Sequence, residues 1–220
     1  MSIRFLITAG GTREYIDPVR FISNASSGKM SYALARAALK AGHKVTLITA
    51  PTALRPPTGA HVVHVESAAQ MFAAVKKHFA ACDCLIMAAA VADFTPAKPS
   101  KTKLKKDAGT KPTLRLKPTP DILKWAGSHR RVCTAHHRPQ IVIGFALEDR
   151  NLRANAERKL HDKHLDMIVA NAPVAIGAET STVHIKTPSS QWLEIPAQRK
   201  TMIAGRIVSL IQGKETSGTS

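Results

Sequence analysis

The first 90 residues alternate between short apolar runs and segments of helical period, and this alternation constrains the fold more than any other feature. The apolar runs lie at 3–7, 44–50 and 83–90, and each has the length of a buried strand. Between them, residues 30–41 and 67–79 place their apolar side chains at helical spacing. A strand–helix–strand–helix–strand order favours a right-handed, parallel, doubly wound sheet, so we expect an α/β fold.

The alternation of strand and helix patterns returns after residue 118 and continues almost to the end of the chain. The sequence predicts a short helix, a strand, a helix, a strand, a β-hairpin and a closing helix, at 120–126, 140–146, 152–164, 165–170, 182–195 and 197–211. No internal repeat or linker interrupts this order, so we expect one Rossmann-like domain over residues 1–212. Residues 213–220 are expected to be a disordered tail.

The segment between the two halves, residues 95–118, is too polar to be core and has no helical period. It contains four prolines and the lysines Lys98, Lys101, Lys103, Lys105, Lys106, Lys111 and Lys117. Long loops in compact domains are often functional lids, so this lysine-rich flap is predicted to be a mobile arm. A solvated loop, the usual fate of a run of charges, is the alternative.

The formal net charge of +17 indicates a protein that handles anions. A basic nucleic-acid-binding module is the rival from a different functional class, because charge alone does not separate the two. The positive charge is spread along the chain, and only 5% of the residues are aromatic. Few side chains are therefore available to stack on bases, so we expect no specific nucleic-acid partner.

The lengths of the apolar runs and the number of cysteines indicate the cellular compartment. No apolar run approaches 18 residues, so no transmembrane helix and no membrane partner are expected. The chain begins directly with a predicted strand and shows no signal-peptide pattern. Three cysteines, Cys82, Cys84 and Cys133, cannot all pair with one another, and we expect reduced thiols, buried in the core of a cytoplasmic protein.

The stretch between the first strand and the first helix carries the best candidate anion site. Gly10 lies in the turn after the strand, and Ser26, Ser27 and Gly28 lie where the helix begins. Free backbone N–H groups and the positive end of the helix dipole favour an anion there, and glycine lets it come close. An ordinary serine N-cap is the alternative. Nearby, Arg20 and Asn24 offer a guanidinium fork and an uncharged amide.

Two further constellations follow. Residues 88–90 are three alanines at the carboxyl end of the third strand, where a ligand could touch the backbone, and Asp93 would be an acceptor at the rim. Small core residues with an N-cap Asp are the alternative.

Lys159 and Lys163 share one face of a predicted helix, which fits a polyphosphate between them or a plain solvated face. Histidines lack partners at zinc spacing, so no protein metal site is expected.

A nicotinamide-dependent reductase is the rival enzyme class. The sequence has neither a Walker loop nor G-x-G-x-x-G, and no acid at the ends of the second strand to hold a nicotinamide ribose. Its tyrosines, Tyr15 and Tyr32, have no lysine four residues later. Hydride transfer is therefore disfavoured.

Together, these stretches resemble phosphopantothenate–cysteine ligase (phosphopantothenoylcysteine synthetase), in many bacteria the C-terminal half of a bifunctional coenzyme A biosynthesis protein. The matching segments run in order over nearly the whole chain. They are I-T-A-G-G-T-R-E at 7–14, D-P-V-R-F-I-S-N-A-S-S-G-K-M at 17–30, A-A-A-V-A-D at 88–93, K-L-K-K at 103–106, T-P-D-I-L at 119–123, G-F-A-L-E at 144–148, K-L-H-D-K-H-L-D at 159–166 and A-N at 170–171. The departures are Ser31, where glycine is often seen, and Thr119, where asparagine is often seen.

The resemblance implies a two-step reaction. The carboxylate of 4′-phosphopantothenate attacks the α-phosphate of CTP, pyrophosphate leaves, and an acyl-cytidylate forms. The amine of L-cysteine then attacks the acyl carbon, and CMP leaves. The resemblance also implies Mg²⁺ carried by CTP, no flavin in this chain, and a homodimer, with the flap and the hairpin at 182–195 as candidate contacts between chains.

The resemblance assigns site residues by matching position. The catalytic residues would be Asn24 and Lys103. Nucleotide binding is expected from Gly10, Ser26, Ser27, Gly28, Asp93, Lys103, Pro120, Asp121, Ile122, Leu123, Phe145, Lys159 and Lys163. Phe145 would lie by the base or ribose, and Lys159 and Lys163 would hold phosphates. Phosphopantothenate and the acyl intermediate would contact Arg20, Asn24, Ala89 and Ala90.

Overall fold

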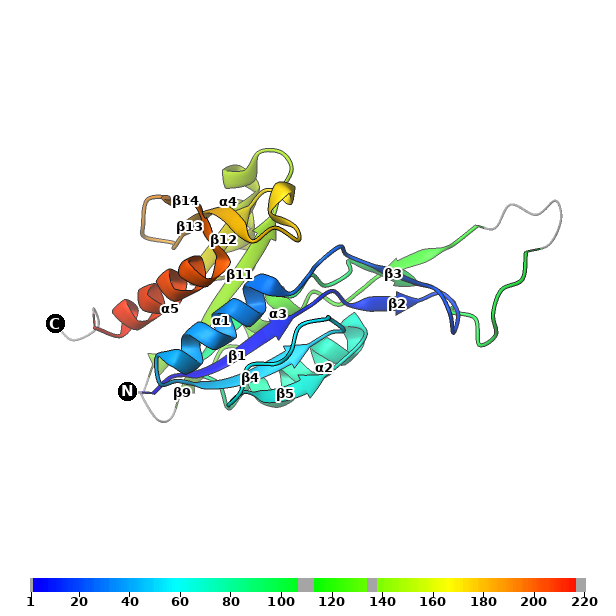
Figure 1. Ribbon diagram of the computed structural model, residues 1–220, viewed down its shortest axis with the longest axis horizontal. Helices are drawn as coiled ribbons and strands as arrows, with labels where there is room; N and C mark the ends of the chain where they lie inside the picture. The colour runs from blue at the N-terminus through cyan, green and yellow to red at the C-terminus, as the bar shows by residue number, and fades with distance from the viewer. Residues whose placement is uncertain (1, 107–112, 134–137, 217–220) are drawn as a thin grey trace.

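An eight-stranded sheet forms the centre of the computed structural model, which describes residues 2–106, 113–133 and 138–216 (Figure 1). The strand order across the sheet is β14-β13-β12-β11-β6-β1-β4-β5. Along the chain these strands are β1 (Arg4–Ala9), β4 (Lys44–Thr49), β5 (His61–His64), β6 (Cys84–Met87), β11 (Ile141–Leu147), β12 (Met167–Asn171), β13 (Thr180–Lys186) and β14 (Leu193–Arg199).

The six strands from β5 to β12 pair in parallel, whereas β13 and β14 join the far edge as an antiparallel hairpin. Strand β1 lies in the middle of the parallel part, with β4 and β5 on one side and β6, β11 and β12 on the other. The chain therefore winds outward from the centre in both directions. This confirms the predicted α/β, doubly wound, mainly parallel sheet and its C-terminal hairpin.

Five helices cover the two faces of the sheet in the described part of the chain. They are α1 (Lys29–Lys40), α2 (Ala68–Phe79), α3 (Ile122–Ser128), α4 (Leu152–Asp162) and α5 (Lys200–Thr216). Alternate residues of β1 point to opposite faces: Phe5 and Ile7 pack with α1 and α5, and Leu6 packs with α2, α3 and α4. Figure 1 shows α1 and α5 side by side on their face.

Several boundaries differ from the sequence prediction. The prediction missed β5, an edge strand with only two apolar residues. The third predicted strand, at 83–90, ends at Met87, so the alanines that follow lie in the loop after β6. Helix α5 begins at Lys200 and continues to Thr216, so residues 213–216 are helical where a disordered tail was predicted. Residues 217–220 lie outside the described part.

A pair of two-stranded ribbons extends away from the sheet (Figure 1). One ribbon pairs β2 (Arg13–Tyr15) with β3 (Phe21–Ser23), and the other pairs β7 (Phe94–Pro96) with β8 (Leu116–Pro118). The second ribbon closes the base of the flap, for which the sequence predicted no regular structure. The tip of the flap, residues 107–112, lies outside the described part.

Two smaller elements and the cysteines complete the fold. A short pair joins β9 (Val132–Cys133) to β10 (Arg138–Pro139), and a 3₁₀ turn, η1 (Pro173–Ala175), follows β12. Cys82 and Cys84 are buried, as predicted, whereas the side chain of Cys133 lies outside the described part. Among the described helices, none combines the length and apolarity needed to cross a bilayer.

Candidate functional site

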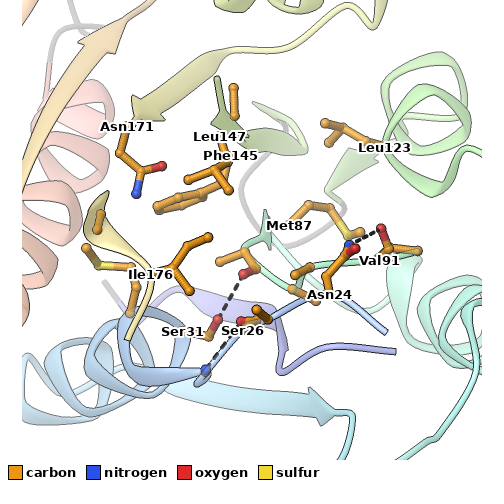
Figure 2. Close-up of a pocket in the computed structure, with 18 of the residues that line it drawn as sticks. Asn24, Ser26, Ser31, Met87, Val91, Leu123, Phe145, Leu147, Asn171 and Ile176 are labelled. Atoms are coloured by element: carbon orange, nitrogen blue, oxygen red, sulfur yellow. Dashed lines mark hydrogen bonds between the residues drawn. The ribbon is translucent and has the colours of Figure 1, made fainter. Parts of the chain in front are cut away.

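A cavity of about 640 Å³ lies at the carboxyl edge of the sheet (Figure 2). Met87, Leu147 and Asn171, the last residues of β6, β11 and β12, line it. It lies beside the point where the winding reverses between β1 and β6. Ligands in doubly wound sheets bind in crevices at such switch points, so this cavity is the candidate site.

The start of α1 forms one wall of the cavity. The helix is capped by Gly28, whose backbone is left-handed at φ 74, and no side chain makes a cap hydrogen bond. The hydroxyls of Ser26 and Ser27 instead accept from the backbone N–H groups of Gly28 and Lys29, at 3.4 and 3.5 Å. The alternative of an ordinary serine N-cap is therefore wrong.

Two polar side chains connect this wall to the loop after β6. The hydroxyl of Ser31 donates to the carbonyl of Ala88 at 3.1 Å, and the amide of Asn24 donates to the carbonyl of Val91 at 3.0 Å. Figure 2 shows both bonds at the floor of the cavity. Ser31, one of the two departures from the family pattern, thus ties α1 to the end of β6.

The opposite wall combines apolar side chains with two ion pairs. Leu123 belongs to this wall, whereas Phe145 packs on the α1–α5 side of the sheet and projects into the cavity across from it (Figure 2). Lys159 pairs with Glu148 at 2.5 Å, and Lys163 pairs with Asp121 at 2.9 Å. The sequence predicted Lys163 within this helix, but α4 ends at Asp162 and Lys163 is its C-cap.

Close packing against α3 fixes the backbone at Lys163. A Cβ built on Gly127 would lie 1.8 Å from the carbonyl oxygen of Lys163, so only glycine fits at this contact. At the start of the same helix, Asp121 caps α3 by accepting from the N–H of Lys124 at 2.9 Å. One short helix therefore places both members of the Lys163–Asp121 pair.

A second pair of lysines lines the cavity near α1 and α5. Lys29 pairs with Glu179 at 2.5 Å and donates to the carbonyl of Gly177 at 2.9 Å. Lys200, the first residue of α5, is 8% exposed and donates to the carbonyl of Ala175 at 2.9 Å. Burial lowers the pKa of Lys200, and the positive charge of Lys29 lowers it further against the opposing effect of Glu179. A hydrogen bond from Lys29 lowers the pKa of the Glu179 carboxyl.

The structure brings most of the predicted site residues to this cavity. They are Asn24, Ser26, Ser27, Gly28, Ala89, Ala90, Asp93, Pro120, Asp121, Ile122, Leu123, Phe145, Lys159 and Lys163. Sequence reasoning missed Lys29, Asn171 and Lys200 as lining residues. Lys29 could have been found within the S-S-G-K-M motif, whereas no local signal points to Lys200.

Three predicted site residues do not line the cavity: Gly10, Arg20 and Lys103. A Cβ on Gly10 would lie 2.7 Å from the carbonyl oxygen of Ala50, so the close approach that glycine allows here is to the protein's own backbone. Its carbonyl accepts from the N–H of Ala90 at 2.8 Å. Gly10 therefore supports the loop after β6, and its contact with the nucleotide stays a prediction.

Arg20 holds the flap instead of facing the cavity. Its guanidinium donates to the carbonyl of Leu104 at 2.6 Å and pairs with the buried carboxylate of Asp17. Asp17 in turn accepts from the N–H of Leu104 at 3.1 Å. These bonds clamp the flap beside Lys103. The hydrogen bond from Arg20 is the main cause that keeps the pKa of Asp17 far below its usual range.

Asp17→Asn should loosen this clamp. The neutral amide lacks the charge that pairs with Arg20, and charge-assisted hydrogen bonds are the stronger ones. Because the lowered pKa keeps Asp17 ionised, wild type should hold the flap at neutral pH and lose the clamp only when acid protonates the carboxyl. We expect trypsin to cut the lysine-rich flap roughly 10-fold faster in the variant at pH 7.5.

Asp149→Asn is the matched control, since Asp149 is an exposed acid outside the flap and its clamp. The fragments are assigned by mass spectrometry. Equal cleavage of wild type and Asp17→Asn within residues 98–106 would contradict the clamp.

The described residues contain no group of three or more His, Cys, Asp or Glu side chains that could hold a metal ion. Of the carboxylates in and near the cavity, Asp121 is paired with Lys163 and Glu148 with Lys159. This donor set does not form a protein metal centre within the described part.

Comparisons with known proteins give the family. Residues 1–214 match the family described as DNA/pantothenate metabolism flavoprotein C-terminal domain. The chain is 44% identical over 211 residues to the coenzyme A biosynthesis bifunctional protein CoaBC of Bacillus subtilis, covering 94% of this chain and 50% of that protein. It therefore spans about half the length of the curated relatives it matches.

Solved structures agree with this match. The crystal structure of the C-terminal domain of a CoaBC protein superposes with a TM-score of 0.81 at 38% identity, over 99% of both chains. The Cab2 mutant H337A in complex with phosphopantothenate-cysteine superposes with a TM-score of 0.76 at 17% identity, over 99% of this chain and 89% of that one, which shows a shared fold. The chain belongs to the DNA/pantothenate metabolism flavoprotein C-terminal domain family, the family of the CoaBC C-terminal domain.

Proposed function

We propose that the chain joins 4′-phosphopantothenate to L-cysteine, with CTP as the activating nucleotide. In the first step, a carboxylate oxygen of phosphopantothenate bonds to the α-phosphorus of CTP. The bond to the β-phosphate oxygen breaks, and pyrophosphate leaves with the electron pair. In the second step, the cysteine nitrogen bonds to the acyl carbon, CMP leaves with the electron pair of the C–O bond, and the amine proton passes to solvent.

One observation carries the proposal: a single cavity, at the switch point of a CoaBC-type domain, collects the residues of several separate family motifs. Asn24 comes from the loop before α1, Asp93 from the loop after β6, and Phe145 from β11. Residues 120–123 lie where α3 begins, and Lys159 comes from α4. Chemistry that joins two substrates through a nucleotide needs such a convergence of groups.

The side chains fit a reaction in which the substrate supplies the nucleophile. Both steps move negative charge among phosphate, carboxylate and acyl oxygens, so the protein's task is to orient the reactants and stabilise charge. The cavity provides ammonium groups, the Asn24 amide and the backbone of the residue 88–90 loop. Ala89 and Ala90 leave that backbone uncovered by large side chains.

Asn24 is the group best placed for the acyl-cytidylate. Its amide nitrogen is held by Val91, so its carbonyl oxygen has a defined direction within the cavity. An uncharged amide can approach an acyl-phosphate group without adding negative charge. We propose that Asn24 contacts the acyl or phosphoryl oxygens of the intermediate.

We also propose that Mg²⁺ arrives with CTP. Mg²⁺ usually keeps several waters and binds through substrate phosphates and only one or two carboxylates. The absence of a metal-binding cluster among the described side chains fits this arrangement. When bound, Mg²⁺ would neutralise charge on the phosphates. Neither step needs a flavin, and that this chain uses none stays a prediction.

A homodimer is the proposed assembly, with the flap ribbon as its candidate contact. Phe21, Phe94 and Leu116, on the two ribbons, are 40%, 54% and 45% exposed. Large apolar side chains gathered on projecting strands are typical of an interaction surface. The hairpin at 182–195 stays the second candidate. A cytoplasmic location stays a prediction from the sequence.

The proposal is tested by mass spectrometry of the product. The purified chain is incubated with 4′-phosphopantothenate, L-cysteine, CTP and Mg²⁺, and each component is omitted in turn. We expect phosphopantothenoylcysteine only when all are present. Folded protein that yields no such product would reject the proposed function.

A further inference from the structure

The loop of residues 88–93, which follows β6, is held by side chains from distant parts of the chain. Ser31 and Asn24 each donate to one of its carbonyl oxygens, as Figure 2 shows. A third donor is the hydroxyl of Thr119, which binds the carbonyl of Ala92 at 2.6 Å. Thr119 is the second departure from the family pattern, so both departures donate hydrogen bonds to this one loop.

The Thr119 bond fixes the backbone next to the group that orients Asn24. Ala92 is 3% exposed, its carbonyl accepts from Thr119, and its N–H donates to the hydroxyl of Thr12 at 2.9 Å. The peptide group that joins Val91 to Ala92 also carries the carbonyl oxygen to which Asn24 donates. The direction of the Asn24 side chain therefore depends on the backbone at Ala92, which two hydroxyls hold at its N–H and at its carbonyl.

Thr119 also joins this loop to the flap and to α3. Its N–H donates to the carbonyl of Asp93 at 2.9 Å, next to Phe94 and Pro118, the last pair of the β7–β8 ribbon. That ribbon closes the base of the flap. Asp121, two residues after Thr119, is the N-cap of α3. Thr119 therefore lies where the flap, the loop after β6 and the start of α3 meet.

A role confined to stability is the alternative, because a buried carbonyl needs a donor wherever it lies. Two observations favour a role in the reaction. Thr119 itself lines the cavity, and the carbonyl that it holds lies between Val91, the partner of Asn24, and Asp93, which also lines the cavity. A shift of about 1 Å in a reacting group can cost roughly 10²-fold in rate, so a small rotation at this point would be felt in catalysis.

We propose that Thr119 is a positioning residue, whose hydroxyl fixes the backbone at Ala92 and thereby aims the amide of Asn24 at the acyl intermediate. Thr119 acts through Asn24 and touches no reacting atom. Its effect on the reaction rests on the proposed function, whereas the restraint on the loop is measurable without substrates. The two parts of the proposal are therefore tested separately.

The restraint is tested by hydrogen–deuterium exchange of the full chain, in peptides that cover residues 88–93. Thr119→Val removes the hydroxyl but keeps the shape of the side chain, and it should speed exchange at the N–H of Ala92 about 10-fold. Thr119→Ser keeps the hydroxyl and should stay within about twofold of wild type. Thr58→Val is the matched control, since Thr58 is exposed in the loop between β4 and β5 and lies outside the cavity.

The effect on the reaction is tested by the yield of the cysteine adduct at saturating substrates. The rate should fall about 10-fold in Thr119→Val and stay within about twofold of wild type in Thr119→Ser. In an Asn24→Ala background, Thr119→Val should cost less than about twofold, because the amide that it aims is already gone. A role confined to stability would instead make the two losses additive.

Three results would overturn the inference: unchanged exchange in Thr119→Val, full activity in the same variant, or additive losses in the double variant. Exchange that changes as expected, in a folded chain whose wild type makes no adduct, would instead reject the proposed function alone. The exchange data and the adduct yields thus separate the two failures.

Discussion

Lys103→Gln is expected to release pyrophosphate roughly 10²–10³ times more slowly than wild type, with 4′-phosphopantothenate and CTP as substrates. This is the effect of removing one preorganised group that stabilises developing charge. Lys103 matches the K-L-K-K motif of the family and lies on the flap. Its glutamine variant keeps a flexible polar side chain, somewhat shorter than lysine, but has no charge.

The structure adds a condition to this prediction. Lys103 does not line the cavity, and the neighbouring residue, Leu104, is held by Asp17 and Arg20. For Lys103 to act, the flap has to reach a cavity, either its own by moving or that of a second chain. The clamp at Leu104 sets the point on the flap from which Lys103 extends.

Lys101→Gln is the control, because it removes the same charge from the flap two residues away. It should release pyrophosphate within about threefold of wild type, as expected for an exposed surface charge. Stopped-flow detection of pyrophosphate over the first turnover measures the step directly. A Lys103→Gln variant that is as fast as wild type would show that Lys103 has no part in cytidylate formation.

Asn24→Asp is expected to reduce formation of the cysteine adduct by roughly 10²-fold. The amide of Asn24 donates to the carbonyl of Val91, and a carboxylate cannot donate, so the side chain loses the bond that orients it. It also places a negative charge toward the acyl-phosphate group of the intermediate, which repels it. Both changes act on the same side chain within the cavity.

Pyrophosphate release supplies the internal control for this variant. The first half-reaction should be affected much less than the second, so acyl-cytidylate should accumulate and be detectable after acid quenching. Circular dichroism checks that the variant remains folded. A normal yield of phosphopantothenoylcysteine from Asn24→Asp would contradict the role proposed for Asn24.

The sheet was predictable because its pattern is local. The runs that became β1, β4 and β6 are mainly apolar, as is typical of strands buried on both faces. The edge strand β5 escaped prediction because only two of its four residues are apolar and both are partly exposed. Tertiary pairing, rather than composition, makes it a strand.

The site was only partly predictable, since its long-range contacts leave no local signal. The motifs identified Asn24 and Phe145, and the fold brings them to one cavity. Nothing near Arg20 shows that it bonds to Leu104, 84 residues later. Likewise, Lys200 reaches the cavity only because β14 ends at the carboxyl edge of the sheet, which depends on the whole strand order.

The most direct test of the proposed ligase is pyrophosphate release by the purified chain with 4′-phosphopantothenate, Mg²⁺ and either CTP or ATP, with and without L-cysteine. We predict release that requires phosphopantothenate, proceeds faster with CTP than with ATP, and continues beyond one turnover only when cysteine is present. Preference for ATP would keep the reaction and contradict the assignment of the nucleotide. No release with either nucleotide, from folded protein, would contradict the ligase and favour the basic binding module.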